Sequence, residues 1–172
     1  MSLDNIEEIA SFIVADGKGI LAADESNPTC GKRFDSIGVE STEENRRDYR
    51  EMLFRSKGMK GNIGGVILFD ETIRQSSEDG SLLRDLISEQ GALPGIKVDK
   101  GLQPIEDCPL ETVTVGLDGL DERLKEYASM GAKFTKWRAV INIGDGIPTD
   151  KCIDANMDAL ADYAKCAQDN GM

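Results

Sequence analysis

Charged side chains stand at the ends of three short apolar runs, and they are the residues best suited to chemistry in this sequence. GILAAD ends in Asp24, GIKVDK contains Lys97 and Asp99, and KFTKWR contains Lys136 and Arg138. A lysine or an arginine binds phosphate, and a carboxylate accepts hydrogen bonds from hydroxyl groups. These groups together are what a phosphorylated, polyhydroxylated substrate requires.

The alternation of side chains along a strand places these charges on common faces. Lys97 and Asp99 share one face of their run, and Lys136 and Arg138 share one face of theirs, while Ile96 supplies the opposite, apolar face. Ligands of parallel α/β sheets bind at the carboxyl ends of the strands, where these residues stand. The alternative for any single strand is a solvated ion pair on the outer face, which contributes roughly 0–1 kcal/mol.

The elements that position these residues are four Ile-, Val- and Phe-rich runs, separated by longer segments with helical periodicity. Strands that alternate with helices in this way indicate βα units and a parallel sheet. The runs cover residues 19–24, 64–69, 95–100 and 133–138. Their spacing is unequal, so we identify no internal repeat.

A capping box predicts the start of a helix over residues 41–56, because Ser41 is followed three residues later by Glu44. The spacing of apolar residues predicts which side of this helix faces the core. The predicted inward face consists of Tyr49, Met52, Leu53 and Ser56.

Two further helices are predicted in the second half of the chain. One covers residues 117–130 and stops at Gly131, and the other runs from Thr149 to Asn170. The predicted inward residues of the last helix are Ile153, Met157, Leu160, Ala164 and Ala167.

Length and charge limit the class of protein. A chain of 172 residues is expected to form one domain, residues 1–172. With 20 Lys and Arg against 32 Asp and Glu, its net charge of −12 argues against nucleic-acid binding. No segment has the apolar length of a membrane span, and the acidic N-terminus does not resemble a signal peptide, so we expect no membrane association.

The absence of histidine excludes Ser-His and Cys-His catalytic pairs and most zinc sites. Four separated cysteines indicate free thiols in a reducing cytoplasm. Gly31-Lys32-Arg33 lacks the residues that a phosphate loop needs around it, and no dinucleotide fingerprint follows a strand. Glu106 and Asp107 are interpreted as loop acids, so neither a metal nor another cofactor is expected.

Six segments, in this order and spacing, resemble the N-terminal half of a class I fructose-bisphosphate aldolase. They are GKGILAADES, STEENRRDYR, GGVILFDET, GIKVDKG, GLDGLDER and FTKWR, and the resemblance runs from about Ile6 to Met172. It implies an α/β fold of the (β/α)8 TIM-barrel family, with this chain supplying about the first four βα units. It also implies a glycolytic lyase that cleaves fructose 1,6-bisphosphate, through a Schiff base, to dihydroxyacetone phosphate and glyceraldehyde 3-phosphate.

The resemblance also assigns roles to individual residues. Asp24 corresponds to the aspartate that binds the C4 hydroxyl side of the substrate and assists proton transfer, and Lys97 and Lys136 correspond to active-site lysines. Arg138 corresponds to a residue near one phosphate.

Three further residues receive substrate-binding roles from the resemblance. Ser26 and Arg33 lie in the segment after the first strand, which approaches the other phosphate, and Arg46 corresponds to a further substrate-binding residue. For Arg46, a solvated arginine on a helix is an equally good interpretation.

The sequence departs from the family pattern at its end. The Schiff-base lysine and the acid–base glutamate of the family lie on later strands, so we expect this chain alone to have little or no activity. We expect a fragment of a longer protein, and the alternatives are two copies that close one barrel or a half-barrel that binds sugar phosphates without catalysis. The family tends to form tetramers, so a homo-oligomer is expected.

Overall fold

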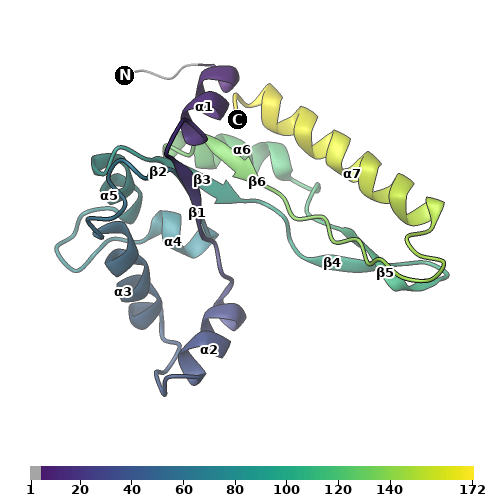
Figure 1. Cartoon of the computed structure of the whole chain (residues 1–172), viewed down its shortest axis with the longest axis horizontal. Coiled ribbons are helices and arrows are strands. Elements are labelled where there is room, and N and C mark those ends of the chain that lie inside the picture. The colour runs from purple at the N-terminus through teal and green to yellow at the C-terminus, as the bar shows by residue number, and fades with distance from the viewer. Residues whose placement is uncertain (1–4) are drawn as a thin grey trace.

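The computed structural model describes residues 5–172 and contains a four-stranded parallel sheet in the order β1-β2-β3-β6 (Figure 1). The strands are β1 (Gly19–Ala23), β2 (Ile63–Leu68), β3 (Leu93–Lys97) and β6 (Phe134–Lys136). Each overlaps one of the four predicted apolar runs, although β2 and β3 begin one and two residues earlier than predicted, and the register of all three strand pairs is parallel. The predicted parallel sheet is therefore confirmed.

Seven helices accompany the strands in the described residues. They are α1 (Ile6–Ile13), α2 (Asn27–Asp35), α3 (Glu43–Phe54), α4 (Asp70–Arg74), α5 (Leu83–Glu89), α6 (Leu120–Ser129) and α7 (Asp150–Asp169). None of these is long and apolar enough to cross a membrane.

One face of the sheet carries the hydrophobic core. Val66 and Leu68 of β2 and Ile96 of β3 are fully buried there, among Phe54 of α3 and Leu124 of α6. Because side chains alternate along a strand, the residues between them point to the opposite face. Lys97 therefore lies on the face that the core does not use.

On the opposite face, an aromatic ring covers the part of the sheet nearer the amino-terminal ends of the strands. Phe134 lies over Gly65 and Gly95, and a Cβ atom added at Gly95 would lie 2.4 Å from the ring. The absence of side chains at these two glycines allows the ring to approach the sheet. Lys136, two residues after Phe134, comes above this apolar layer on the same face.

A second, two-stranded sheet forms an arm beside the main sheet (Figure 1). The antiparallel strands β4 (Leu102–Ile105) and β5 (Cys108–Thr114) make a hairpin against which α7 packs. The buried Glu111 joins hairpin and helix, since its carboxylate accepts hydrogen bonds of 2.7 Å from the backbone N–H and the hydroxyl of Thr149. Burial alone would raise the pKa of Glu111, but these hydrogen bonds outweigh it and lower the pKa. The sequence patterns did not predict this hairpin.

The predicted start of the helix over 41–56 is wrong by one residue, and its predicted inward face is only partly right, because Leu53 packs against the core but Met52 does not. The N-cap is Thr42, whose hydroxyl accepts a hydrogen bond from the backbone N–H of Asn45, and not Ser41. The buried residues are Arg50 and Phe54, whereas Met52 is 62% exposed. The apolar pattern misleads here because the core side of α3 includes a fully bonded arginine.

The last helix begins after Thr149 as predicted, and Ala167 is buried as predicted, but the rest of its inward face differs. Cys152, Asn156 and Ala159 are buried, and Met157 is 63% exposed. Asn156 faces inward because its amide donates a 2.9 Å hydrogen bond to the backbone carbonyl of Thr112 on the hairpin. Polar bonding to the hairpin therefore sets the orientation of this helix.

Candidate active site

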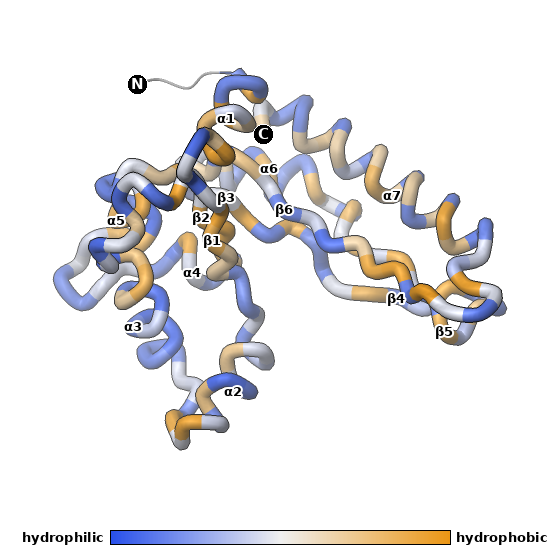
Figure 2. The backbone as a smooth tube through the Cα atoms, viewed as in Figure 1, coloured by the Kyte–Doolittle hydropathy of each residue, from blue (hydrophilic) through white to orange (hydrophobic). Residues whose placement is uncertain are grey.

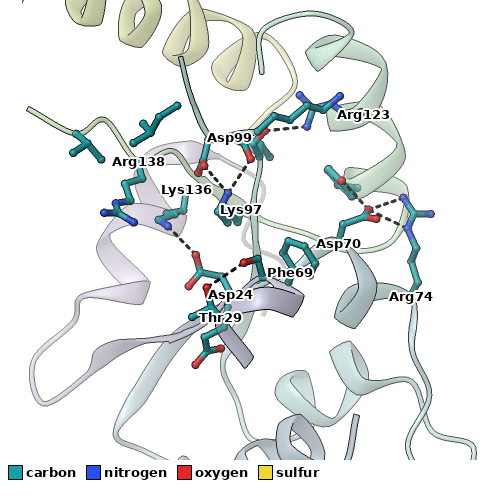
Figure 3. A pocket seen from close by; sticks show the side chains of 18 of the residues that line it. Asp24, Thr29, Phe69, Asp70, Arg74, Lys97, Asp99, Arg123, Lys136 and Arg138 are labelled. Carbon is teal, nitrogen blue, oxygen red and sulfur yellow. Dashed lines mark hydrogen bonds and ion pairs between the residues drawn. The ribbon is translucent and has the colours of Figure 1, made fainter. Parts of the chain in front are cut away.

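An open pocket of about 890 Å³ lies at the carboxyl ends of β1, β3 and β6 (Figure 3). Five of the seven predicted site residues line it, namely Asp24, Ser26, Lys97, Lys136 and Arg138. Asp99, the acidic neighbour noted in the sequence, lines it too. The structure therefore brings the charged ends of three runs, distant in sequence, into one concave site.

Two lysine–carboxylate pairs form the centre of this pocket. Lys136 donates a 2.8 Å hydrogen bond to Asp24, across 112 positions of sequence. Lys97 pairs with the carboxylate of Asp99 and donates a 2.9 Å hydrogen bond to its backbone carbonyl. The Asp99 and Asp24 side chains are only 6% and 13% exposed, so both pairs are partly shielded from water.

Strand register explains why the two lysines are neighbours. Lys97 and Lys136 are directly paired positions of β3 and β6. Two cations at adjacent strand positions repel each other, and a separate carboxylate for each offsets this repulsion. Arg138, which is exposed and makes no side-chain ion pair in the described part of the chain, lies two residues after Lys136.

The opposite wall of the pocket consists of charged residues that the sequence analysis missed. Asp70 at the start of α4 pairs with Arg74 (Figure 3). Asp70 also accepts a 2.8 Å hydrogen bond from Tyr127, and Arg74 also binds Glu126. Burial raises the pKa of Tyr127, and its hydrogen bond to Asp70 adds to the effect. Asp70 was detectable, because it follows the second apolar run directly and so stands at a strand's carboxyl end.

Arg123 of α6 also lines this wall. Its guanidinium donates to the backbone carbonyls of Val98, at 3.0 Å, and of Gly116. It thus joins the segment after β3 to the segment before α6, and supports the loop that carries Asp99.

Arg33 and Arg46 do not line the pocket. The segment after the first strand is a helix, α2, and Arg33 within it binds the carboxylate of Glu25 and, at 3.1 Å, the hydroxyl of Tyr49. The Arg46 guanidinium makes a bidentate contact with the Glu71 carboxylate, with distances of 2.7 Å from Nε to Oε1 and 2.6 Å from Nη2 to Oε2. Both arginines are therefore paired with carboxylates of the chain itself.

The Arg46–Glu71 pair predicts a specific dependence of stability on pH. The hydrogen bonds from Arg46 lower the pKa of Glu71 below its ordinary value. A carboxylate whose pKa is lower in the folded state stabilises the protein at pH values above its unfolded pKa, which is about 4.3. This stabilisation is lost as the pH falls through the folded pKa. We therefore expect Glu71→Gln to destabilise the protein at pH 7 and to have a shrinking effect below about pH 4.3.

Urea unfolding of both proteins between pH 3 and pH 7 measures this difference. Glu89→Gln, an exposed glutamate on α5, is the control and is expected to change the unfolding midpoint little. A Glu71→Gln effect of the same size at pH 3 as at pH 7 contradicts the assignment.

Comparison with known proteins identifies the family. The family model for class I fructose-bisphosphate aldolases matches residues 5–172. The chain belongs to the class I fructose-bisphosphate aldolase family. A probable class 1 aldolase of Xylella fastidiosa is 55% identical over 100% of this chain and 52% of its own length. The cytosolic fructose-bisphosphate aldolase 4 of Arabidopsis thaliana is 51% identical over 95% of this chain and 42% of its own length.

A solved aldolase structure confirms the predicted fold class. The aldolase of Plasmodium falciparum, crystallised with TRAP and a small-molecule inhibitor, superposes with a TM-score of 0.93 at 48% identity, over 95% of this chain and 48% of that one. The chain is therefore an α/β structure of the TIM-barrel aldolase family, with an open four-stranded parallel sheet. It spans about half the length of the relatives it matches.

Within residues 5–172, no group of three or more cysteine, aspartate or glutamate side chains is arranged to hold a metal ion. The pocket instead offers paired ammonium and carboxylate groups, which suit proton transfer and the binding of phosphate and hydroxyl groups.

Proposed function

We propose that this pocket binds fructose 1,6-bisphosphate and takes part in its Schiff-base cleavage to dihydroxyacetone phosphate and glyceraldehyde 3-phosphate, a step of glycolysis. The observation that supports it most is the pair of lysine–carboxylate contacts in one pocket at the strand ends. The family to which the chain belongs gives the reaction class.

The central pair gives each partner a complementary role. Asp24 accepts a hydrogen bond from the substrate's C4 hydroxyl and assists proton transfer from it. Lys136 provides the adjacent positive charge and a proton donor for the hydroxyl that leaves when the carbinolamine dehydrates. Lys97, beside it on β3, adds positive charge on the same side of the substrate.

The phosphate groups are assigned to the two rims of the pocket. Arg138 binds one phosphate, since it is the exposed cation next to the central pair. Ser26, the N-cap residue of α2, binds the other through its hydroxyl. Arg33 and Arg46 reach substrate only by exchanging their present carboxylate partners for phosphate, so we assign them weaker contributions.

Neither pocket lysine is proposed to form the Schiff base. A lysine attacks a ketone as the free amine, and both side-chain nitrogens are committed to carboxylates. Borohydride reduction with dihydroxyacetone phosphate, followed by peptide mapping, is expected to leave Lys97 and Lys136 unlabelled. A label on either lysine overturns this assignment of roles.

Calorimetric titration with fructose 1,6-bisphosphate tests the proposed function. We expect one site per chain, competition by dihydroxyacetone phosphate, and much weaker binding of unphosphorylated fructose. Equal affinity for fructose and its bisphosphate contradicts a phosphate-binding pocket. Binding without any turnover supports the other candidate function, a half-barrel that binds sugar phosphates without catalysis. The pairing of both lysines with carboxylates favours this candidate.

We further propose that the chain is a single domain that self-associates in the cytoplasm. The arm contains hydrophobic stretches of chain (Figure 2). Some of its apolar side chains are exposed, among them Leu110 at 67% and Ile143 at 89%. These two segments are adjacent, because Asn142 donates a hydrogen bond to the carbonyl of Leu110. Sedimentation analysis of Leu110→Asp tests this proposal, and the expected result is a smaller species than the unmodified protein gives.

A further inference from the structure

A buried arginine lies directly behind the segment that carries Asp24. Arg50 of α3 is only 2% exposed, and its guanidinium donates from Nε to the carbonyl of Ala23 at 2.8 Å and from Nη2 to the carbonyl of Glu25 at 3.0 Å. These two carbonyls belong to the residues on either side of Asp24. One rigid group therefore fixes the backbone on both sides of the pocket carboxylate.

The rest of the guanidinium is also engaged. Nη2 lies 2.9 Å from the Glu25 carboxylate, and Nη1 donates to the Cys30 sulfur at 3.2 Å. The Glu25 carboxylate also binds Arg33 and accepts a 3.2 Å hydrogen bond from Tyr49. A planar, forked guanidinium with this set of acceptors holds its partners in one geometry, which a lysine ammonium does not reproduce.

The place of this contact in the fold explains its use. The pairing of β1 with β2 ends at Ala23, so strand hydrogen bonds no longer hold the backbone at Asp24. Arg50 supplies hydrogen bonds to the chain at the position where the sheet stops supplying them. The Asp24 side chain is then presented to Lys136, 2.8 Å away.

We propose that Arg50 is a positioning residue that fixes Asp24 for its contact with Lys136. It touches neither Lys136 nor the pocket, and acts on the site through the backbone of residues 23–25. The consequence for catalysis rests on the proposed function, whereas the effect on the Asp24–Lys136 pair does not.

The reactivity of Lys136 tests the proposal without substrate. An ammonium held by a carboxylate reacts slowly with acetic anhydride, so Asp24→Asn is expected to raise the acetylation rate of Lys136 about two- to fivefold, the range that a partly exposed ion pair supports. Arg50→Lys is expected to give the same rise. The double variant is expected to show no further increase, because both changes act on one contact.

Lys97 is the internal control in the same digest. Its partner is Asp99, on a different segment, so its acetylation rate is expected to remain unchanged in all three variants. Arg47→Lys is the matched control, because Arg47 lies on the same helix, outside the pocket, and its guanidinium pairs with Asp48 and Glu44 and not with the Asp24 segment. We expect normal Lys136 reactivity in this variant.

Two results overturn the proposal. One is unchanged Lys136 reactivity in folded Arg50→Lys, and the other is an equal rise at Lys97 and Lys136, which indicates general loosening. Where Arg50→Lys does not fold, NMR of the unmodified protein decides. A slowly exchanging Arg50 Nε–H coupled to the Ala23 carbonyl supports the proposal, and a rapidly exchanging one contradicts it. Titration with fructose 1,6-bisphosphate tests the proposed function separately.

Discussion

Replacing Lys136 by alanine is expected to weaken the binding of fructose 1,6-bisphosphate about 10- to 100-fold. A hydrogen bond to a charged group contributes about 1.5–3 kcal/mol, and each 1.4 kcal/mol corresponds to about tenfold in affinity. The substitution also leaves the Asp24 carboxylate, 13% exposed, without its partner, so a negative charge faces an anionic ligand. Isothermal titration calorimetry of both proteins measures the difference.

Lys133→Ala is the matched control for this measurement. Lys133 is exposed and stands just before β6, at the end of the strand away from the pocket. Its removal lowers the net charge equally but is expected to change affinity less than about twofold, as for a screened surface charge. Equal losses from the two substitutions mean that general electrostatic attraction, and not the pocket, binds the sugar phosphate.

Replacing Phe54 by alanine is expected to lower the free energy of unfolding by about 3–5 kcal/mol, the usual cost of removing a buried aromatic side chain. Phe54 is fully buried between α3 and the sheet, within the core cluster that contains Val66 and Ile96. Met52→Ala, on the same helix, is expected to cost less than about 0.5 kcal/mol, because Met52 is 62% exposed. Urea unfolding followed by circular dichroism measures both values.

This pair of variants tests the orientation of α3. The apolar periodicity of the sequence points Met52 inward, whereas the structure points Arg50 and Phe54 inward. A larger loss of stability from Met52→Ala than from Phe54→Ala contradicts the observed orientation. Such a result would also remove the geometric basis of the contact between Arg50 and the Asp24 segment.

The sheet and the convergence of residues at the centre of the candidate site were predictable because their signals are local. Buried parallel strands are short apolar runs, and the alternation of side chains along a strand places Lys97 and Ile96 on opposite faces of the sheet. The convergence of Asp24 and Lys136 follows once the strands are parallel, since their carboxyl ends meet at one edge. The structure has both residues in one pocket, 2.8 Å apart.

The arm was not predictable from the same signals. Three of the four residues of β4 are exposed, and the strand contains Pro104, so it lacks the apolar pattern of a core strand. The turn of the hairpin depends on Asp107, whose φ of 64° is uncommon for a residue other than glycine. The orientation of α7 follows from polar contacts with this hairpin, such as that of Asn156, and apolar periodicity does not detect them.

The positions of the arginines were beyond sequence reasoning for a different reason. Arg46 meets Glu71, 25 positions later, and Arg50 meets Glu25, 25 positions earlier. Whether an arginine is committed to the chain or available to a ligand depends on such tertiary contacts. Residue type and spacing alone leave both roles open.

A crystal structure of the chain with fructose 1,6-bisphosphate tests the central claim most directly. The account predicts that the sugar phosphate lies in the pocket at the ends of β1, β3 and β6, with a hydroxyl group on Asp24, a phosphate on Arg138, and Lys136 within hydrogen-bond distance of the substrate. A bisphosphate bound at any other surface, with the Asp24–Lys136 pair unchanged, contradicts it.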